Sequence, residues 1–200
     1  MKRLFIKNKN AGFTLAETLI TILILMMVTL ISAVGISVAV RGYNRVLDTA
    51  NAQLLLSSTV TRLREELSTA VWAELTDGDL VMYYNGDKGF NSELIVDETS
   101  SSGKGIKIRY SARAGALVPE EPVSLVPKVT LSEKGKQDQE LYAAYDSITF
   151  DNGVFKVKNL CVKRSDRTEP VVTMKEGGAD GYLYIVPIAK PEIKATAVGP

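Results

Sequence analysis

The chain is organised around residues 12–17, Gly-Phe-Thr-Leu-Ala-Glu, which run directly into the apolar segment TLITILILMMVTLISAVGISVAV at residues 18–40. No charged residue interrupts that segment. At about 1.5 Å of rise per residue, a helix of roughly 23 residues is about 35 Å long, which is enough to cross the hydrocarbon core of a bilayer. The sequence therefore predicts a membrane-spanning helix over about residues 18–40.

The leader before this segment carries only basic charges, at Lys2, Arg3, Lys7 and Lys9. By the positive-inside rule these residues keep the N-terminus in the cytoplasm, and the chain after Arg41 lies outside it. We therefore expect a single-pass protein of the cell membrane, in contact with the lipids of the inner or cytoplasmic membrane, with an extracytoplasmic head.

Two simple interpretations of residues 1–40 stay open beside a more specific one. A secretory signal peptide has an apolar core of about 7–15 residues before a cleavage site of small residues. Ser37-Val38-Ala39 fits such a site, but the apolar run before it is too long. An uncleaved single-span anchor fits both the length of the run and its basic flank.

The more specific interpretation comes from the whole N-terminal pattern. A basic leader that ends in Gly12, followed by Phe13, Thr-Leu, one variable residue and Glu17, resembles the prepilin leader of type IV pilins and pseudopilins. The resemblance covers residues 1–40. It implies cleavage after Gly12 by a prepilin peptidase, N-methylation of Phe13, and assembly with other pilin or pseudopilin subunits into a surface or periplasmic filament.

Glu17 is an isolated carboxylate at the start of the apolar segment, where an unpaired charge in lipid costs at least a few kcal/mol. The resemblance implies that it pairs with the new α-amine of Phe13 in a neighbouring subunit and so fixes the register of assembly. Thr14 and Glu17 also fit a capping box, in which Glu17 accepts a hydrogen bond from a backbone N–H at the helix start. The two roles are compatible.

Composition excludes several kinds of chemistry. Four of the 24 Lys and Arg residues lie in the leader, which contains none of the 23 Asp and Glu residues, so the remainder is mildly acidic and has no general attraction for nucleic acid. With no His and a single Cys, the chain cannot form a Ser-His-Asp or Cys-His catalytic arrangement, a His or multi-Cys zinc site, or an internal disulfide. We expect no enzymatic activity, no metal and no cofactor, and Cys161 as a small core residue.

The sequence predicts three parts: a cleaved leader at residues 1–12, a long helix at 13–76, and a single β-rich head at 77–200. In the outer half of the helix an apolar stripe recurs at three- and four-residue steps, through Leu56, Val60, Leu63 and Leu67, as on a helix that packs against a sheet. The turn at residues 76–79, Thr-Asp-Gly-Asp, is expected to end it. The fold class is therefore α+β, with a long N-terminal helix packed on an antiparallel β-sheet, which is also the pilin-like architecture that the resemblance implies.

The head shows the period-two alternation and turn signals of strands. We expect strands at residues 80–84, 93–96 and 106–110, with Lys107 and Arg109 on the solvent face of the last. A hairpin is predicted from residues 147–150 and 154–163, with a bulge near Asn159. The last strand is predicted at residues 182–188, where Pro187 indicates a sheet edge or a strand end.

Basic residues cluster in two parts of the head. Lys104, Lys107, Arg109 and Arg113 form one group; a second includes the candidate contact residues Lys156, Lys158, Lys163 and Arg164. They form either a solvated face or a contact surface for DNA or another acidic partner. The sequence as a whole predicts a minor pilin or pseudopilin of a type IV pilus-like or type II secretion-like filament. A competence pseudopilin that contacts DNA, and a static membrane-anchored binding module, are the alternatives; adhesion, motility, secretion and DNA uptake are not distinguished.

Overall fold

The computed structural model describes residues 14–86, 90–99, 103–111, 121–131, 139–174 and 181–196. The leader, the predicted cleavage site at Gly12 and Phe13, and Arg113 lie outside the described residues. The chain divides into two compact units, with the boundary between Val46 and Leu47.

A single long helix, α1 (Leu15–Ser68), crosses that boundary. The predicted end at residue 76 is wrong, because the helix stops at Ser68 and a strand begins at Ala70. Two hydrogen bonds satisfy carbonyls at the helix end: the Thr69 hydroxyl donates to the Glu65 carbonyl (2.9 Å), and the Ile188 N–H donates to the Ser68 carbonyl (2.8 Å). The β-branched and aromatic residues that follow then favour an extended chain.

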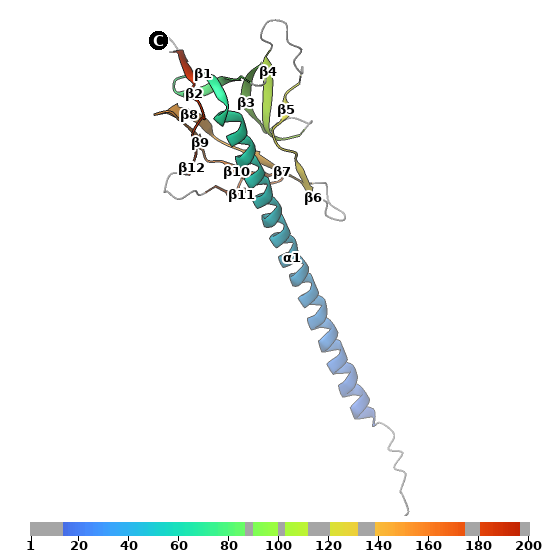
Figure 1. Ribbon diagram of the computed structural model, residues 1–200. Helices are drawn as coiled ribbons and strands as arrows, with labels where there is room; N and C mark the ends of the chain where they lie inside the picture. The colour runs from blue at the N-terminus through green and yellow to red at the C-terminus, as the bar shows by residue number, and fades with distance from the viewer. Residues whose placement is uncertain are drawn as a thin grey trace, which may run out of the picture. The chain divides into compact units, whose positions relative to one another are not determined.

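The described residues of the head form two sheets (Figure 1). The larger contains nine strands: β1 (Ala70–Thr76), β2 (Asp79–Asn85), β3 (Asn91–Asp97), β4 (Gly105–Ser111), β5 (Val123–Ser124), β8 (Ser147–Asp151), β9 (Val154–Lys158), β12 (Tyr182–Ile185) and β13 (Glu192–Thr196). The smaller contains four: β6 (Val129–Leu131), β7 (Gln139–Ala144), β10 (Cys161–Arg164) and β11 (Pro170–Thr173). Neighbouring strands pair antiparallel except β1 and β13, which are parallel. The predicted α+β, pilin-like fold class is confirmed.

The C-terminal part of α1 packs against both sheets within the second unit. Leu63 and Leu67 are fully buried in one cluster with core residues of the larger sheet such as Tyr83 and Phe155. Ala52 and Leu55, about three turns earlier, pack in a second cluster with Leu141 and Val162 of the smaller sheet. The predicted apolar stripe therefore faces the sheets, with Leu63 and Leu67 fully buried and Leu56 and Val60 partly buried.

The hairpin prediction is confirmed for β8 and β9, whose ladder runs without a register shift from Ser147 opposite Lys158 to Asp151 opposite Val154. The continuation to residue 163 is wrong. Instead of forming a bulge, Asn159 adopts a positive φ of 53° and turns the chain out of β9 toward β10 in the other sheet.

At the other end of the head, β12 is an edge strand, as predicted, but it ends at Ile185 rather than at residue 188 and is not the last strand. Strand β13 was not predicted, and Lys107 is 5% exposed rather than solvated. The first four residues of β4 are all buried, because both faces of that part of the strand are covered. In a strand that is covered on both faces, the alternation of polar and apolar residues does not indicate which polar side chains reach water.

Candidate functional site

The N-terminus of α1 forms the capping box that the sequence predicts. The Thr14 N–H donates to Glu17 Oε2 (2.9 Å), and the Glu17 N–H donates back to Thr14 Oγ1 (3.3 Å). The Thr14 hydroxyl also donates to Glu17 Oε2 (3.0 Å). These bonds satisfy two backbone donors at the helix start and fix the rotamer of the carboxylate. Both bonds to the carboxylate end on Oε2, and Oε1 has no partner among the described residues.

Four of the five hydroxyl groups in the apolar segment donate to carbonyls of the helix itself. These bonds are Thr18 to Leu15 (2.8 Å), Thr21 to Glu17 (2.9 Å), Thr29 to Met26 (2.9 Å) and Ser37 to Val34 (2.8 Å). In lipid, a hydroxyl without a partner is costly, and this back-bonding removes that cost. These four residues are therefore compatible with an apolar environment.

The first unit leaves its apolar surface uncovered. Within the described residues, α1 is the one helix long and apolar enough to cross a membrane. Its large apolar side chains between Leu15 and Val40 are each at least 52% exposed. An apolar surface of this length needs lipid or the helices of other subunits around it.

The four candidate contact residues do not form one surface. Lys156 and Lys158 lie on β9 of the larger sheet, opposite Tyr184 and Tyr182 of β12, whereas the other two lie on β10 of the smaller sheet. Lys156 donates to Asp151 (2.7 Å), and this hydrogen bond raises the pKa of the Lys156 ammonium.

The two basic residues of β10 also form ion pairs with carboxylates. Lys163 Nζ lies 2.8 Å from Glu98, and the hydrogen bond raises the pKa of Lys163. Arg164 reaches Asp48 of α1 (3.1 Å) and forms two bonds to Asp166 (2.6 and 3.0 Å). Only 13% of the Arg164 side chain is exposed, so this residue ties α1 to β10 rather than facing a partner.

The described members of the first basic group also contact acidic or aromatic side chains. Lys107 contacts Asp97 (2.8 Å) inside the head, and Arg109 contacts Glu93 (2.9 Å) at the surface. Lys104 lies 5.7 Å from the centre of the Tyr142 ring, within cation–π range.

Cys161 is a free thiol, 7% exposed, as expected of a core residue. Burial raises its pKa, which disfavours the reactive thiolate. In the described part of the chain, no three Asp, Glu, His or Cys side chains gather in a group that could hold a metal ion.

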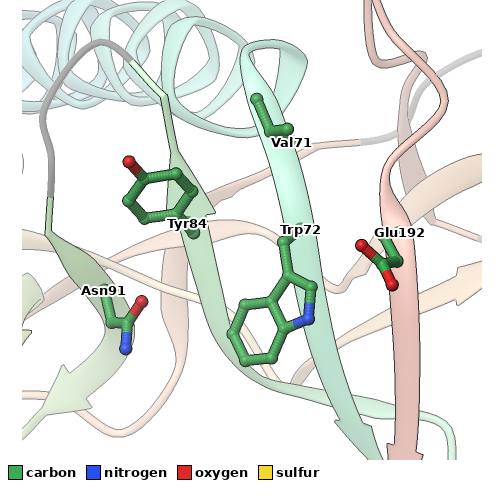
Figure 2. Close-up of a pocket in the computed structure, with 5 residues that line it drawn as sticks. All are labelled: Val71, Trp72, Tyr84, Asn91 and Glu192. Atoms are coloured by element: carbon green, nitrogen blue, oxygen red, sulfur yellow. The ribbon is translucent and has the colours of Figure 1, made fainter. Parts of the chain in front are cut away.

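A hollow on the larger sheet was missed by the sequence analysis. It has a volume of about 400 Å³ and is lined by Val71 and Trp72 of β1, Tyr84 of β2, Asn91 of β3 and Glu192 of β13 (Figure 2). The sequence signal for this hollow is the alternation of Trp72 and Glu74 with the buried Ala73 and Leu75, which is typical of a strand. The prediction of a helix for these residues hides that alternation.

A comparison with known proteins identifies a family at the N-terminus. Residues 7–33 match the family model described as the prokaryotic N-terminal methylation motif. No curated protein and no solved structure matches the chain. The residues of the match include the Gly, Phe and Glu of the predicted leader pattern and the first half of the apolar segment. This chain thus carries the prepilin leader signature of type IV pilins and pseudopilins.

Proposed function

We propose that the protein is a structural subunit, a minor pilin or pseudopilin, of a type IV pilus-like or type II secretion-like filament. The single observation that carries this proposal is the methylation motif at residues 7–33, which runs into a helix whose apolar side chains are uncovered. A helix of this kind suits storage in the membrane and later burial among the helices of other subunits.

In this proposal a prepilin peptidase cleaves after Gly12 on the cytoplasmic side, and Phe13 becomes the methylated N-terminus. The new ammonium is then four residues before Glu17 in the sequence. In the filament, the ammonium of one subunit pairs with Glu17 of its neighbour, because either charge alone would be costly among apolar helices.

The capping box is compatible with this pairing, because it fixes the Glu17 side chain before the pair forms. Both bonds from Thr14 end on Oε2 of Glu17, so they fix the side chain and leave Oε1 to accept from a neighbouring subunit. A carboxylate held in one rotamer loses less conformational entropy when it pairs. Thr14 is therefore a positioning residue for Glu17.

The test is the N-terminal mass and the filament content of Glu17→Ala, produced in a host that contains a prepilin peptidase. The wild-type chain should begin at methylated Phe13 and occur in sheared filaments. The variant should be processed and membrane-bound but absent from those filaments. An intact Met1 or cleavage near Ala39 would overturn the processing step, and normal incorporation of Glu17→Ala would overturn the pairing step.

A pseudopilin that contacts DNA is the second candidate, favoured by the two lysines of β9 that lie opposite Tyr182 and Tyr184. It has weaker support, since Lys156, Lys163 and Arg164 are each paired with a carboxylate. Charge reversal at both Lys156 and Lys158 should lower DNA binding and its salt slope if this face contacts phosphates. Unchanged binding would remove this candidate.

A further inference from the structure

The hollow on the larger sheet is built from one row of register partners. Glu192 lies opposite Trp72, Trp72 opposite Tyr84, and Tyr84 opposite Asn91, so the row crosses β13, β1, β2 and β3. Partnered residues on neighbouring strands project from the same face of a sheet. Ala73 and Tyr83, the next residues along β1 and β2, are fully buried, so the row faces away from the core.

The row has two aromatic side chains at its centre and a polar side chain at each end (Figure 2). The Glu192 carboxylate accepts hydrogen bonds, the Asn91 amide both donates and accepts, and the Trp72 and Tyr84 side chains each carry a donor. Val71, 48% exposed, lies beside them where the β1–β2 register shifts between Ala70 and Trp72. Such a shift marks a β-bulge, which bends the strand locally.

The ligand that fits these groups has apolar faces and a polar rim. A pyranose ring has this form, because its C–H bonds project from its faces while its hydroxyls surround its edge. The C–H face stacks on the aromatic rings, and the hydroxyls reach the carboxylate and the amide. We propose that this hollow binds a neutral hexopyranose unit of a carbohydrate. Its volume of about 400 Å³ lies within the usual range for small-molecule sites.

The charges around the row do not by themselves separate a neutral ligand from a cation. Aromatic rings with a carboxylate also attract ammonium groups, through cation–π contacts. Lys194 follows Glu192 by two residues on the same face of β13, and Glu74 of β1 places a carboxylate opposite it. The polar groups at both ends of the row favour a neutral ligand that carries hydroxyls, and a cationic probe tests the alternative.

Trp72 is the only tryptophan in the chain, so its fluorescence reports directly on the proposed site. The full-length protein is kept in amphipol, which contains neither sugar nor quaternary ammonium groups; a maltoside detergent would compete for the site. Neutral methyl glycosides and disaccharides of glucose, galactose, mannose and N-acetylglucosamine are titrated, with tetramethylammonium chloride as the cationic probe. Saturation-transfer NMR on the same samples detects binding that leaves the emission unchanged.

We expect at least one sugar to give a saturable response with a dissociation constant in the millimolar range or below. Asn91→Ala and Glu192→Gln, both at the rim of the hollow, should each weaken binding about threefold to tenfold. Tyr184→Ala, which removes an exposed tyrosine of β12 outside the row, should leave it unchanged.

Three outcomes would overturn the inference. They are no saturable response to any sugar by either measurement, an equal loss in Tyr184→Ala, and saturation by tetramethylammonium alone. None of these outcomes bears on the filament role, which rests on the N-terminus, and failure of the filament role would leave the sugar site untouched.

Discussion

At the residue scale, the ion pair between Lys107 and Asp97 has two unequal members. The Lys107 side chain is 6% exposed and the Asp97 side chain 22%, with 2.8 Å between Nζ and Oδ2. Removing one member of a buried pair removes its compensation of the other charge, and the penalty grows with the burial of the charge that remains. We therefore expect the loss of Asp97 to cost more stability than the loss of Lys107.

We predict that Asp97→Ala lowers the free energy of unfolding by about 3 kcal/mol, because it removes the carboxylate that lies 2.8 Å from the buried Lys107 ammonium. Lys107→Met keeps the apolar stem and leaves a carboxylate that water reaches, so it should cost about 1 kcal/mol or less. Urea denaturation of both variants measures the difference. Equal losses, or a larger loss for Lys107→Met, would contradict this explanation.

At the scale of elements, Arg164 joins α1 to β10 through Asp48 and holds the turn after β10 through Asp166. Its guanidinium serves both carboxylates at once because it carries several N–H donors in a fixed plane. Burial alone would raise the pKa of Asp166, but the hydrogen bond and charge of Arg164 outweigh it, and the pKa lies below its usual value. The carboxylate therefore adds stability above its unfolded pKa, and this stability is lost as the pH falls through the lower folded value.

We predict that Arg164→Ala lowers the free energy of unfolding at pH 7 by about 2 kcal/mol, and that Arg164→Lys restores only part of it, because an ammonium cannot replace the planar fork. The deficit should begin to shrink below about pH 4, the usual pKa of an Asp carboxyl, and shrink further as the pH falls through the lower folded pKa of Asp166. Urea midpoints at pH 7 and pH 3 test both statements. A deficit that is the same at both values would show that packing, not charge, explains the loss.

Much of the arrangement of elements could be predicted from the sequence, because periodicity reports burial. The apolar segment, the stripe through Leu63 and Leu67, the hairpin β8–β9 and the edge position of β12 follow from local pattern. At the N-terminus the capping box follows from Thr14 and Glu17 alone. These features depend on residues that lie close together in the chain.

The rest depends on long-range partners. Ala70 and Val71 continue the apolar spacing of the helix, so the sequence predicts a helix for residues 70–76, whereas pairing with β2 and β13 makes them a strand. The row of Glu192, Trp72, Tyr84 and Asn91 comes from three separate stretches of sequence and exists only once the register is known. The same holds for the pairing of the basic residues: Lys163 and Glu98 lie far apart in the chain.

At the scale of the whole molecule, the boundary between Val46 and Leu47 separates a unit with an exposed apolar surface from a unit with a buried core. The first unit has an uncovered apolar surface, whereas every buried hydrophobic residue of the two main core clusters lies at or after Ala52. The second unit therefore contains its own core, and the last turns of α1 are part of it.

We predict that a fragment beginning at Leu47 is soluble without detergent and unfolds cooperatively, since it keeps Ala52, Leu55, Leu63 and Leu67 against the sheets. A matched fragment beginning at Ala70 loses these four side chains. At about 2 kcal/mol for each buried leucine, the three leucines alone contribute about 6 kcal/mol, which is comparable with the whole stability of a domain of this size. That shorter fragment should aggregate or bind a dye specific for exposed apolar surface. Circular dichroism on heating and size-exclusion chromatography compare the two.

If the shorter fragment also unfolds cooperatively as a monomer, the C-terminal turns of α1 are not part of the core. If the longer one is insoluble, the head depends on the membrane segment for its fold, and the boundary at Val46 does not mark an independent unit.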